Sequence, residues 1–434
     1  MKIGIIGAGA TGMAAAWDFL RAGHEVTLYE AEQRVGGLAS GFKDDGWDWW
    51  LEKFYHHWFE SDSDILKLAE ALGVRDKILF PRPKTSYWMN GRIVRSEITP
   101  LSALMLPLPL SAKPRFLLAG AFLKLTPFWQ PLESITADEW FRRYMGEPGY
   151  DKFFKPLLIG KFGDEYDKVN MAWMWARVHA RSVRLGLFTG GFQAFLDTLA
   201  AALTERGAKI RLNTRVERIG YDGGTLSLQV EGETVALDRI LSTTSPKLLL
   251  KLAPQLGNTH YGDSVADLRS IGGLCVVLAL KQQLLTDGTY WLNLPATSPN
   301  KNESRFPFLA LVEHTNWMDK AHYGGDHLIY CGDYVAANHE YFRMSEDALA
   351  ERFIAVLPSF NRDFKPDWIR KYWVFRAPYA QPVPYLNQSK LIPALETPLP
   401  GLYWASMSQV YPWDRGTNFS VEMGRRVAAQ MMQA

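Results

Sequence analysis

The chain has 434 residues, of which 47% are hydrophobic, with 48 basic and 46 acidic residues and a formal net charge of +2 at pH 7. This length is enough for two domains of ordinary size and a sizeable core. Balanced charge gives no electrostatic footprint for nucleic acid, so we expect no nucleic-acid partner. The two cysteines, Cys275 and Cys331, lie in apolar runs and indicate buried thiols in a reducing compartment. We therefore expect a cytoplasmic protein.

The first forty residues contain a dinucleotide-binding pattern. A β-branched run predicts a buried strand that ends at the G-x-G-x-x-G sequence of residues 7–12. In this pattern Gly7 permits a tight turn, Gly9 lets the backbone approach a pyrophosphate, and Gly12 lets the next helix pack closely on the strand. The N-terminus of that helix favours negative charge, so no lysine is needed to bind the phosphates.

A second strand is predicted over residues 25–29, and it ends at Glu30. The carboxylate of Glu30 can accept hydrogen bonds from ribose hydroxyls, and its charge would repel a 2′-phosphate. Strand, turn, helix, strand and acidic residue follow in the required order within a unit of about 30 residues. This order makes an adenosine-containing dinucleotide the expected ligand.

The sequence after this strand carries a family resemblance. Residues 30–39 read Glu-Ala-Glu-Gln-Arg-Val-Gly-Gly-Leu-Ala, which resembles the E-x-x-x-R-x-G-G segment of the flavin-dependent amine oxidase, protoporphyrinogen oxidase and phytoene desaturase superfamily. The resemblance implies FAD as cofactor. Together with the glycine turn, it assigns to cofactor binding Gly7, Ala8, Gly9, Thr11, Gly12, Glu30, Ala31, Arg34, Gly36, Gly37, Leu38 and Ala39. For Arg34, the alternative is a solvated surface arginine.

Later segments resemble the points where the chain of the superfamily returns to the FAD domain. The first return has a glycine pair at 190–191, a helix, and a strand that ends in a valine, whose backbone meets the adenine in the superfamily; Val216 holds that place. Thr243 and Thr244 fall in the loop that passes under the cofactor, for which an ordinary strand end is the alternative. The last return is a strand over 401–409 and a closing helix over 418–432.

This last return departs from the superfamily pattern. Ser406-Met407 stands where Gly-Asp is usual, so the usual carboxylate contact is in question. Either Asp414 replaces it, or Asp414 and Arg415 pair with each other. Backbone N–H groups at the start of the closing helix remain available to negative charge. They begin at about Gly416 and continue through Thr417 and Asn418.

Residues 47–59 contain seven aromatic side chains and the adjacent pair His56 and His57. One interpretation is a lining for planar rings, with a histidine as proton donor or acceptor. The other is an aromatic core with two satisfied histidines. The segment loosely resembles the corresponding stretch of UDP-galactopyranose mutases, which share the superfamily's fold. His56 and His57 are therefore the candidate catalytic residues.

The rest of the chain predicts a substrate domain. Residues 136–184 favour helices, and residues 271–376 favour antiparallel strands. The expected fold class is α/β, with a Rossmann-like FAD-binding domain that contains a parallel sheet and an α+β substrate domain with an antiparallel sheet and a helical part. The FAD-binding domain would comprise residues 1–75, 185–250 and 395–434, and the substrate domain residues 76–184 and 251–394.

The apolar segment 101–130 allows two interpretations. Its prolines exclude a spanning helix. Residues 116–123 are either core of the substrate domain, which we favour, or a lid or peripheral membrane contact. No His, Cys or carboxylate cluster has the spacing of a metal site, so no metal is expected.

These features predict an FAD-dependent oxidoreductase, either an oxidase, a dehydrogenase or a desaturase. It would transfer a hydride from a small-molecule substrate to flavin N5, with O₂ or a quinone as electron acceptor. One alternative is a non-redox, flavin-dependent enzyme like the nucleotide-sugar mutases, motivated by the histidine pair and the basic residues near Arg177. A further alternative is a non-catalytic binding protein stabilised by FAD.

Overall fold

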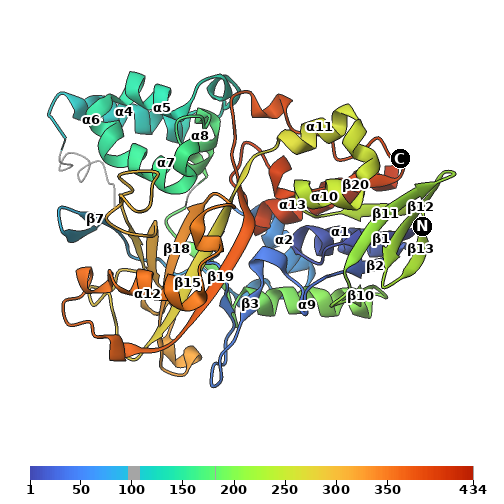
Figure 1. The fold of residues 1–434 in the computed structure, drawn as a ribbon, viewed down its shortest axis with the longest axis horizontal. Coiled ribbons are helices and arrows are strands. Elements are labelled where there is room, and N and C mark those ends of the chain that lie inside the picture. Colours follow the sequence, from blue (N-terminus) through green and yellow to red (C-terminus); the bar gives the residue numbers. More distant parts are fainter. Residues whose placement is uncertain (96–107, 181, 434) are drawn as a thin grey trace.

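The structure is a computed structural model that describes residues 1–95, 108–180 and 182–433. Figure 1 shows a parallel sheet with its helices on one side of the molecule, a large sheet on the other side, and a helical part beside the large sheet. Part of the predicted apolar segment 101–130, namely residues 101–107, lies outside the described residues.

The parallel sheet has five strands in the order β10-β2-β1-β14-β20, and each neighbouring pair runs in parallel. This confirms the predicted parallel sheet. The last strand is shorter than predicted, because Ser406 caps a 3-10 turn over Met407–Gln409. The strands are β1 (Lys2–Ile6), β2 (Glu25–Tyr29), β10 (Lys209–Arg211), β14 (Arg239–Ser242) and β20 (Leu402–Trp404).

Helices pack around this sheet and close the chain onto its beginning. A Cβ added at Gly424 in the last helix would lie 2.4 Å from the carbonyl oxygen of Thr11 in the first helix, so the two helices are in close contact. This contact needs glycine. The helices near the sheet are α1 (Ala10–Arg21), α2 (Ser63–Ala71), α9 (Phe192–Glu205), α10 (Pro246–Leu252), α11 (His260–Asp267) and α13 (Thr417–Gln433).

Three smaller sheets accompany the parallel sheet. An antiparallel meander orders its strands β11-β12-β13, and two further sheets are β3-β4 and β5-β9-β6. The bounds are β3 (Gly41–Phe42), β4 (Leu51–Glu52), β5 (Trp58–Phe59), β6 (Ile78–Leu79), β9 (Leu185–Phe188), β11 (Val216–Asp222), β12 (Thr225–Val230) and β13 (Glu233–Leu237).

The large sheet has seven strands in the order β19-β15-β18-β17-β16-β7-β8. The prediction of an antiparallel sheet is confirmed except at one pair, because β16 and β7 run in parallel. The β7-β8 hairpin comes from earlier in the chain and turns at Asn90 and Gly91, both with positive φ, as its Asn-Gly sequence favours. The strands are β7 (Thr85–Met89), β8 (Arg92–Arg95), β15 (Ser270–Leu280), β16 (Trp291–Asn293), β17 (Ala310–Glu313), β18 (His327–Val335) and β19 (Ile369–Pro382), and α12 (Glu346–Ile354) packs on the sheet.

The helical part contains α4 (Ala112–Leu125), α5 (Ala137–Trp140), α6 (Glu147–Gly149), α7 (Lys155–Phe162) and α8 (Met171–His179). Its core is rich in tryptophan and phenylalanine.

A second core lies between the parallel sheet and one face of the large sheet, and it contains Cys275, whereas Cys331 is buried on the other face. Within the described ranges, none of the helices has both the length and the apolar character needed to cross a membrane.

Candidate cofactor and active site

Two glycines of the turn after β1 have different roles. Gly12 allows close packing, and Gly9 leaves open space. A Cβ at Gly12 would lie 2.2 Å from the carbonyl oxygen of Gly7, so Gly12 is required for helix packing. A Cβ at Gly9 would meet no atom closer than the carbonyl oxygen of Gly36, at 4.0 Å. Because Gly9 has an ordinary extended conformation, with φ of −77°, the fold itself does not demand glycine there. Its missing side chain leaves open space at the turn.

The carboxylate of Glu30 holds the same turn. Its Oε2 atom accepts a hydrogen bond from the backbone N–H of Ala8 at 2.8 Å, and its Oε1 atom accepts one from the N–H of Glu32 at 3.0 Å. Each carboxylate oxygen has capacity for a further bond. Glu30 therefore positions the turn and keeps acceptor capacity for ribose hydroxyls.

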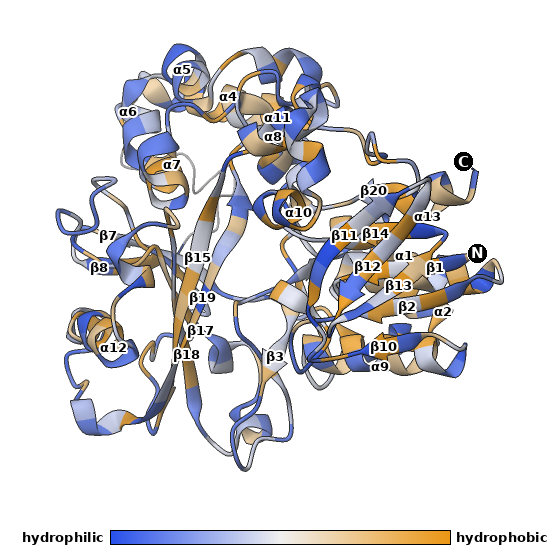
Figure 2. Cartoon of the chain, turned by 45° about the vertical axis from the view of Figure 1, so that its right-hand side comes forward, coloured by the Kyte–Doolittle hydropathy of each residue, from blue (hydrophilic) through white to orange (hydrophobic). Residues whose placement is uncertain are grey.

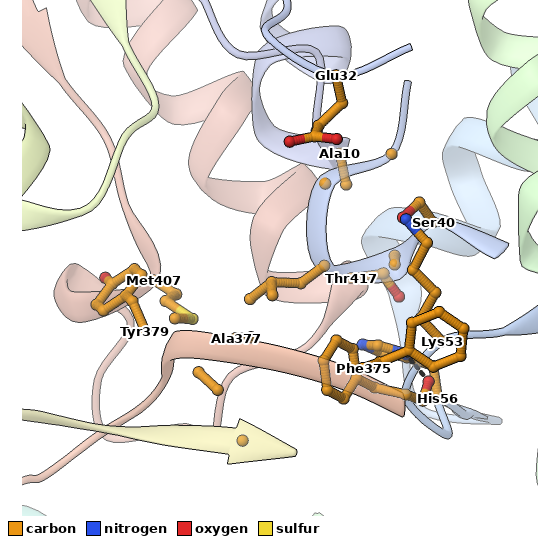
Figure 3. Close-up of a pocket in the computed structure, with 18 of the residues that line it drawn as sticks. Ala10, Glu32, Ser40, Lys53, His56, Phe375, Ala377, Tyr379, Met407 and Thr417 are labelled. Atoms are coloured by element: carbon orange, nitrogen blue, oxygen red, sulfur yellow. Dashed lines mark hydrogen bonds between the residues drawn. The ribbon is translucent and has the colours of Figure 1, made fainter. Parts of the chain in front are cut away.

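A cavity of about 940 Å³ extends from this turn to the large sheet. Its size lies at the upper end of the range for small-molecule and cofactor sites. Figure 3 shows Ala10 and Glu32 at one end, Lys53, His56 and Phe375 together on one side, and Tyr379 and Met407 away from them. The cavity is thus elongated and connects the dinucleotide turn with aromatic and polar side chains of the large sheet.

Most of the predicted cofactor residues line this cavity. They are Gly7, Gly9, Thr11, Glu30, Arg34, Gly36, Gly37, Leu38, Ala39, Thr243, Thr244, Gly416 and Thr417. Arg34 is exposed to solvent, and its guanidinium lies 4.6 Å from the centre of the Trp50 ring. Six predicted residues are not among those that line the cavity: Ala8, Gly12, Ala31, Val216, Asp414 and Asn418.

The first turn of α13 lies against the cavity. Gly416, Thr417 and Ser420 line it, and the side chain of Thr417 is fixed by a hydrogen bond from Trp58 Nε1 at 2.6 Å. The side chain of Asn418 has a role separate from the one predicted for its backbone N–H. Its Oδ1 atom accepts the N–H groups of Asp64 and Ile65, at 2.9 and 3.1 Å, in the first turn of α2. The side chain of Asn418 therefore caps another helix.

The structure distinguishes the two histidines. His56 lines the cavity, and its Nδ1 atom lies 2.5 Å from the carbonyl oxygen of Phe54. A carbonyl can only accept, so Nδ1 carries the proton and Nε2 is the unprotonated nitrogen. Burial, and then the positive charge of Arg415, lowers the pKa of His56 to about 4. His56 is therefore neutral at pH 7, with a proton-accepting nitrogen.

His57 does not line the cavity. Its Nε2 atom is hydrogen-bonded to the hydroxyl of Tyr290, and its ring packs against Trp291 and Trp317. The interpretation of a satisfied histidine in an aromatic core describes His57. Of the two histidines only His56 lines the cavity, and proton handling by it stays a prediction.

Asp414 does not line the cavity, so it does not replace the usual carboxylate contact there. Its carboxylate is paired with Lys161 and Arg177 and accepts a hydrogen bond from Trp173 Nε1 at 3.2 Å. Burial would raise the pKa of Asp414, but the surrounding cations hold it well below its usual value. Asp414 thus fastens the loop before α13 to helices α7 and α8, and Arg177 pairs with it instead of facing a substrate.

Arg415, next to Asp414, does line the cavity. Its guanidinium donates to the carbonyl oxygen of Ala380 and to the hydroxyl of Tyr334, rather than to the carboxylate of Asp414. Both acceptors are neutral, and the nearby carboxylate of Asp414 is shared with Lys161 and Arg177. Net positive charge therefore remains beside the N-terminus of α13. Positive charge and helix N–H groups at one place favour a developing negative charge there.

Several cavity residues were missed by the sequence analysis. Lys53 follows the strand β4, and Phe375, Ala377 and Tyr379 belong to β19. The hydroxyl of Tyr379 lies 2.8 Å from the Ser408 hydroxyl. A basic residue within the aromatic segment 47–59 was a signal for Lys53, whereas β19 gave none that separates its cavity residues from its core residues.

The residues present fit FAD as the cofactor. The open side of Gly9 and the first turn of α1 suit a pyrophosphate, and Glu30 suits the ribose of an adenosine. Arg34 and Lys43 lie beside the same part of the cavity, both against the ring of Trp50. At the other end, the aromatic side chains and the N-terminus of α13 suit a planar ring that gains negative charge. For a metal, in contrast, the described part of the chain offers no group of three or more His, Cys, Asp or Glu residues.

Comparison with known proteins agrees with this geometry. Residues 10–432 match the model of the flavin containing amine oxidoreductase family. The chain belongs to this family. It is 29% identical to the mitochondrial protoporphyrinogen oxidase of Nicotiana tabacum over 182 residues, which is 39% of this chain and 34% of that protein. The chain therefore matches about a third of the length of this curated relative.

Solved structures show the same fold along the whole chain. An oxidoreductase from Methanosarcina mazei has a TM-score of 0.75 at 19% identity, with all of both chains covered. Reduced UDP-galactopyranose mutase has a TM-score of 0.76 at 18% identity, covering 100% of this chain and 95% of that one. These results confirm the predicted family and fold class, and they confirm the predicted cofactor as a flavin.

Proposed function

We propose that this member of the flavin-containing amine oxidoreductase family binds FAD and oxidises a small organic molecule. The observation that carries the proposal is the cavity that connects the dinucleotide turn of β1 with His56, Arg415 and the N-terminus of α13. When bound, the flavin supplies the hydride-accepting group. The chain supplies binding, orientation and proton transfer.

The predicted cofactor residues that line the cavity fall into groups that suit different parts of the cofactor. Gly9 and the helix N-terminus after it receive the pyrophosphate, Glu30 receives the ribose, and Arg34 adds positive charge. At the far end, Arg415 and the N-terminus of α13 favour negative charge on the ring system that lies against them. The two ends together explain why a dinucleotide fits better than a mononucleotide.

His56 is the proposed proton acceptor. Its Nδ1–H is engaged by the carbonyl of Phe54, which fixes the orientation of the ring and leaves Nε2 as the acceptor. A substrate that gives up a hydride from a C–H bond also gives up a proton from the adjoining N–H or O–H group. In this proposal Nε2 of His56, a residue that lines the cavity, receives that proton.

Anaerobic mixing of the flavin-loaded protein with a panel of amines, tetrapyrroles, polyenes and alcohols tests this function. We expect at least one class to bleach the flavin absorbance in single turnover, and O₂ or a quinone to restore it. The protein would be a non-catalytic binder if every class left the flavin oxidised while dithionite reduced it, and if the reduced protein turned over no UDP-sugar.

The non-redox alternative predicts a different outcome of the same experiment. A UDP-sugar would be isomerised only after dithionite reduction, with no net electron transfer. Its support is weaker, because Arg177, one of the basic residues that motivated it beside the histidine pair, is paired with Asp414. A reduced protein that isomerises UDP-sugars and an oxidised protein that no substrate reduces would establish this alternative instead.

A further inference from the structure

Helix α4 has two apolar faces, of which only one is buried. Ala112, Phe116, Ala119 and Leu123 recur at helical spacing and pack into the core of the helical part. This buried face accounts for the attachment of the helix to the protein. A surface helix normally carries polar residues on its other side.

The outer face of α4 is apolar as well. Leu118, Ala121, Phe122 and Leu125 also recur at helical spacing, and the exposed fractions are 72% for Leu118, 47% for Phe122 and 77% for Leu125. We call these four residues the outer face. Exposed apolar residues aligned on one helix face indicate an interaction site rather than scattered surface residues.

Neighbouring side chains enlarge the apolar surface beyond α4. The ring of Phe122 stacks on Trp140 at 5.9 Å, and Trp140 lies 5.0 Å from Tyr144, which is partly exposed. Beyond the two ends of the helix, Leu110 and Phe128 are strongly exposed. Figure 2 places α4 in the helical part, at the far side of the molecule from β1 and β2.

The charges on α4 itself have one sign, while the acidic residues Glu139 and Glu147 lie on the neighbouring helices α5 and α6. The charged residues of α4 are Lys113, Arg115 and Lys124, and the sequence has no acidic residue from 98 to 132. Arg115 donates to the carbonyl oxygens of Arg143 and Tyr144, which do not neutralise its charge. An apolar helix face bordered by basic residues fits the interface of a bilayer with anionic lipids.

We propose that the outer face of α4 rests on a lipid bilayer that contains anionic headgroups. The helix has 14 residues and is about 21 Å long, which is too short to cross the hydrocarbon core of about 30 Å. It therefore lies in the plane of the interface, with the leucines toward the acyl chains. The proposal does not depend on the identity of the substrate.

A bilayer fits this surface better than a second copy of the chain. A two-fold dimer would place the outer face against itself, and this arrangement would bring the basic residues of α4 close to the same residues of the other copy. Like charges brought together at an interface oppose association. Anionic headgroups instead complement these charges.

Vesicle cosedimentation of the full-length, flavin-loaded protein tests the proposal. We expect the protein to sediment with vesicles of phosphatidylcholine and phosphatidylglycerol, and less with phosphatidylcholine alone. Added salt should weaken binding, because it screens the basic residues. The double variant Leu118→Ser and Leu125→Ser should bind about tenfold more weakly or worse, since both leucines lose their apolar contact with the lipid.

The matched control is Leu248→Ser with Leu391→Ser, two exposed leucines elsewhere on the molecule. It should bind as the wild type does. Flavin content and circular dichroism establish that both variants fold. The proposal is wrong if the wild type binds neither kind of vesicle or if the α4 variant binds as well as the control. It is also wrong if the wild type is a dimer that the α4 variant dissociates.

Discussion

The carboxylate of Glu52 accepts a hydrogen bond from the backbone N–H of Phe192 across 2.8 Å. Phe192 begins α9, so this bond ties the aromatic segment beside the cavity to the helix that follows the glycine pair at 190–191. Glu52 is almost fully buried, and burial raises its pKa from 4.5 to about 7. The structure therefore contains a carboxyl whose ionisation changes near neutral pH.

Glu52→Gln should alter the pH dependence of stability. Below pH 4.5 the carboxyl is protonated in the folded and unfolded states, and as pH rises to about 7 only the folded state keeps the proton. The stabilising contribution of this proton is thus lost as pH rises through 7. Relative to the wild type, the free energy of unfolding of the variant should increase by about 3 kcal/mol between these limits. Denaturant titrations at pH 5 and pH 8 measure this, and a difference independent of pH would contradict it.

Gly9→Ala and Gly12→Ala should have opposite effects on fold and cofactor. An alanine at position 9 meets no protein atom within contact distance, so the fold should survive while the flavin is lost. An alanine at position 12 would overlap the carbonyl oxygen of Gly7, and it should destabilise the fold by about 1–3 kcal/mol. Thermal melting of the apoproteins measures the effect on the fold, and flavin absorbance after adding FAD measures the effect on cofactor binding. Retained flavin in Gly9→Ala would place the pyrophosphate elsewhere.

His56→Ala should slow substrate-dependent reduction of the flavin by about 10²-fold or more, since it removes the proposed proton acceptor. His57→Ala is the control, because His57 does not line the cavity. In the wild type, the pKa of His56 is lowered to about 4. The rate of flavin reduction by substrate should therefore be independent of pH from about 5.5 upward and should fall below pH 4. Stopped-flow reduction across pH measures both. Equal losses in the two variants would assign a structural role to the histidine pair.

Arg415→Met should lower the reduction potential of the bound flavin, whereas Arg415→Lys should largely restore it. The guanidinium is positively charged and has neutral partners, Ala380 and Tyr334, so it favours the more negatively charged, reduced form. Dye equilibration measures the potential without any substrate. A potential that does not change in Arg415→Met would show that the charge acts on the substrate or on the fold instead.

The N-terminal unit was predictable because its parts follow one another in the sequence. The turn at Gly7 to Gly12, the strand β2 and Glu30 form a local unit, and each residue type has one physical reason to be there. The same holds for the Asn90-Gly91 hairpin. Local sequence predicted the strand, turn and helix of this unit, and the family resemblance of residues 30–39 added the other residues that line the dinucleotide end of the cavity.

The ring end of the cavity was less predictable, because long-range contacts determine it. Asp414 meets Lys161 and Arg177, which are more than 230 residues earlier in the chain, and no local pattern indicates that pairing. His56 and His57 are neighbours with the same chemistry, and only their tertiary contacts separate the cavity residue from the core residue. The side chain of Asn418 caps α2, and its position at the start of the closing helix gave no sign of that contact.

The central claim is that the cavity holds FAD. The most direct measurement is the identity and amount of the nucleotide that the purified protein releases on denaturation, before and after incubation with FAD. We predict one FAD per chain from the wild type and almost none from Gly9→Ala. A wild-type protein that releases no flavin and takes up none, or that releases only FMN, would contradict the account.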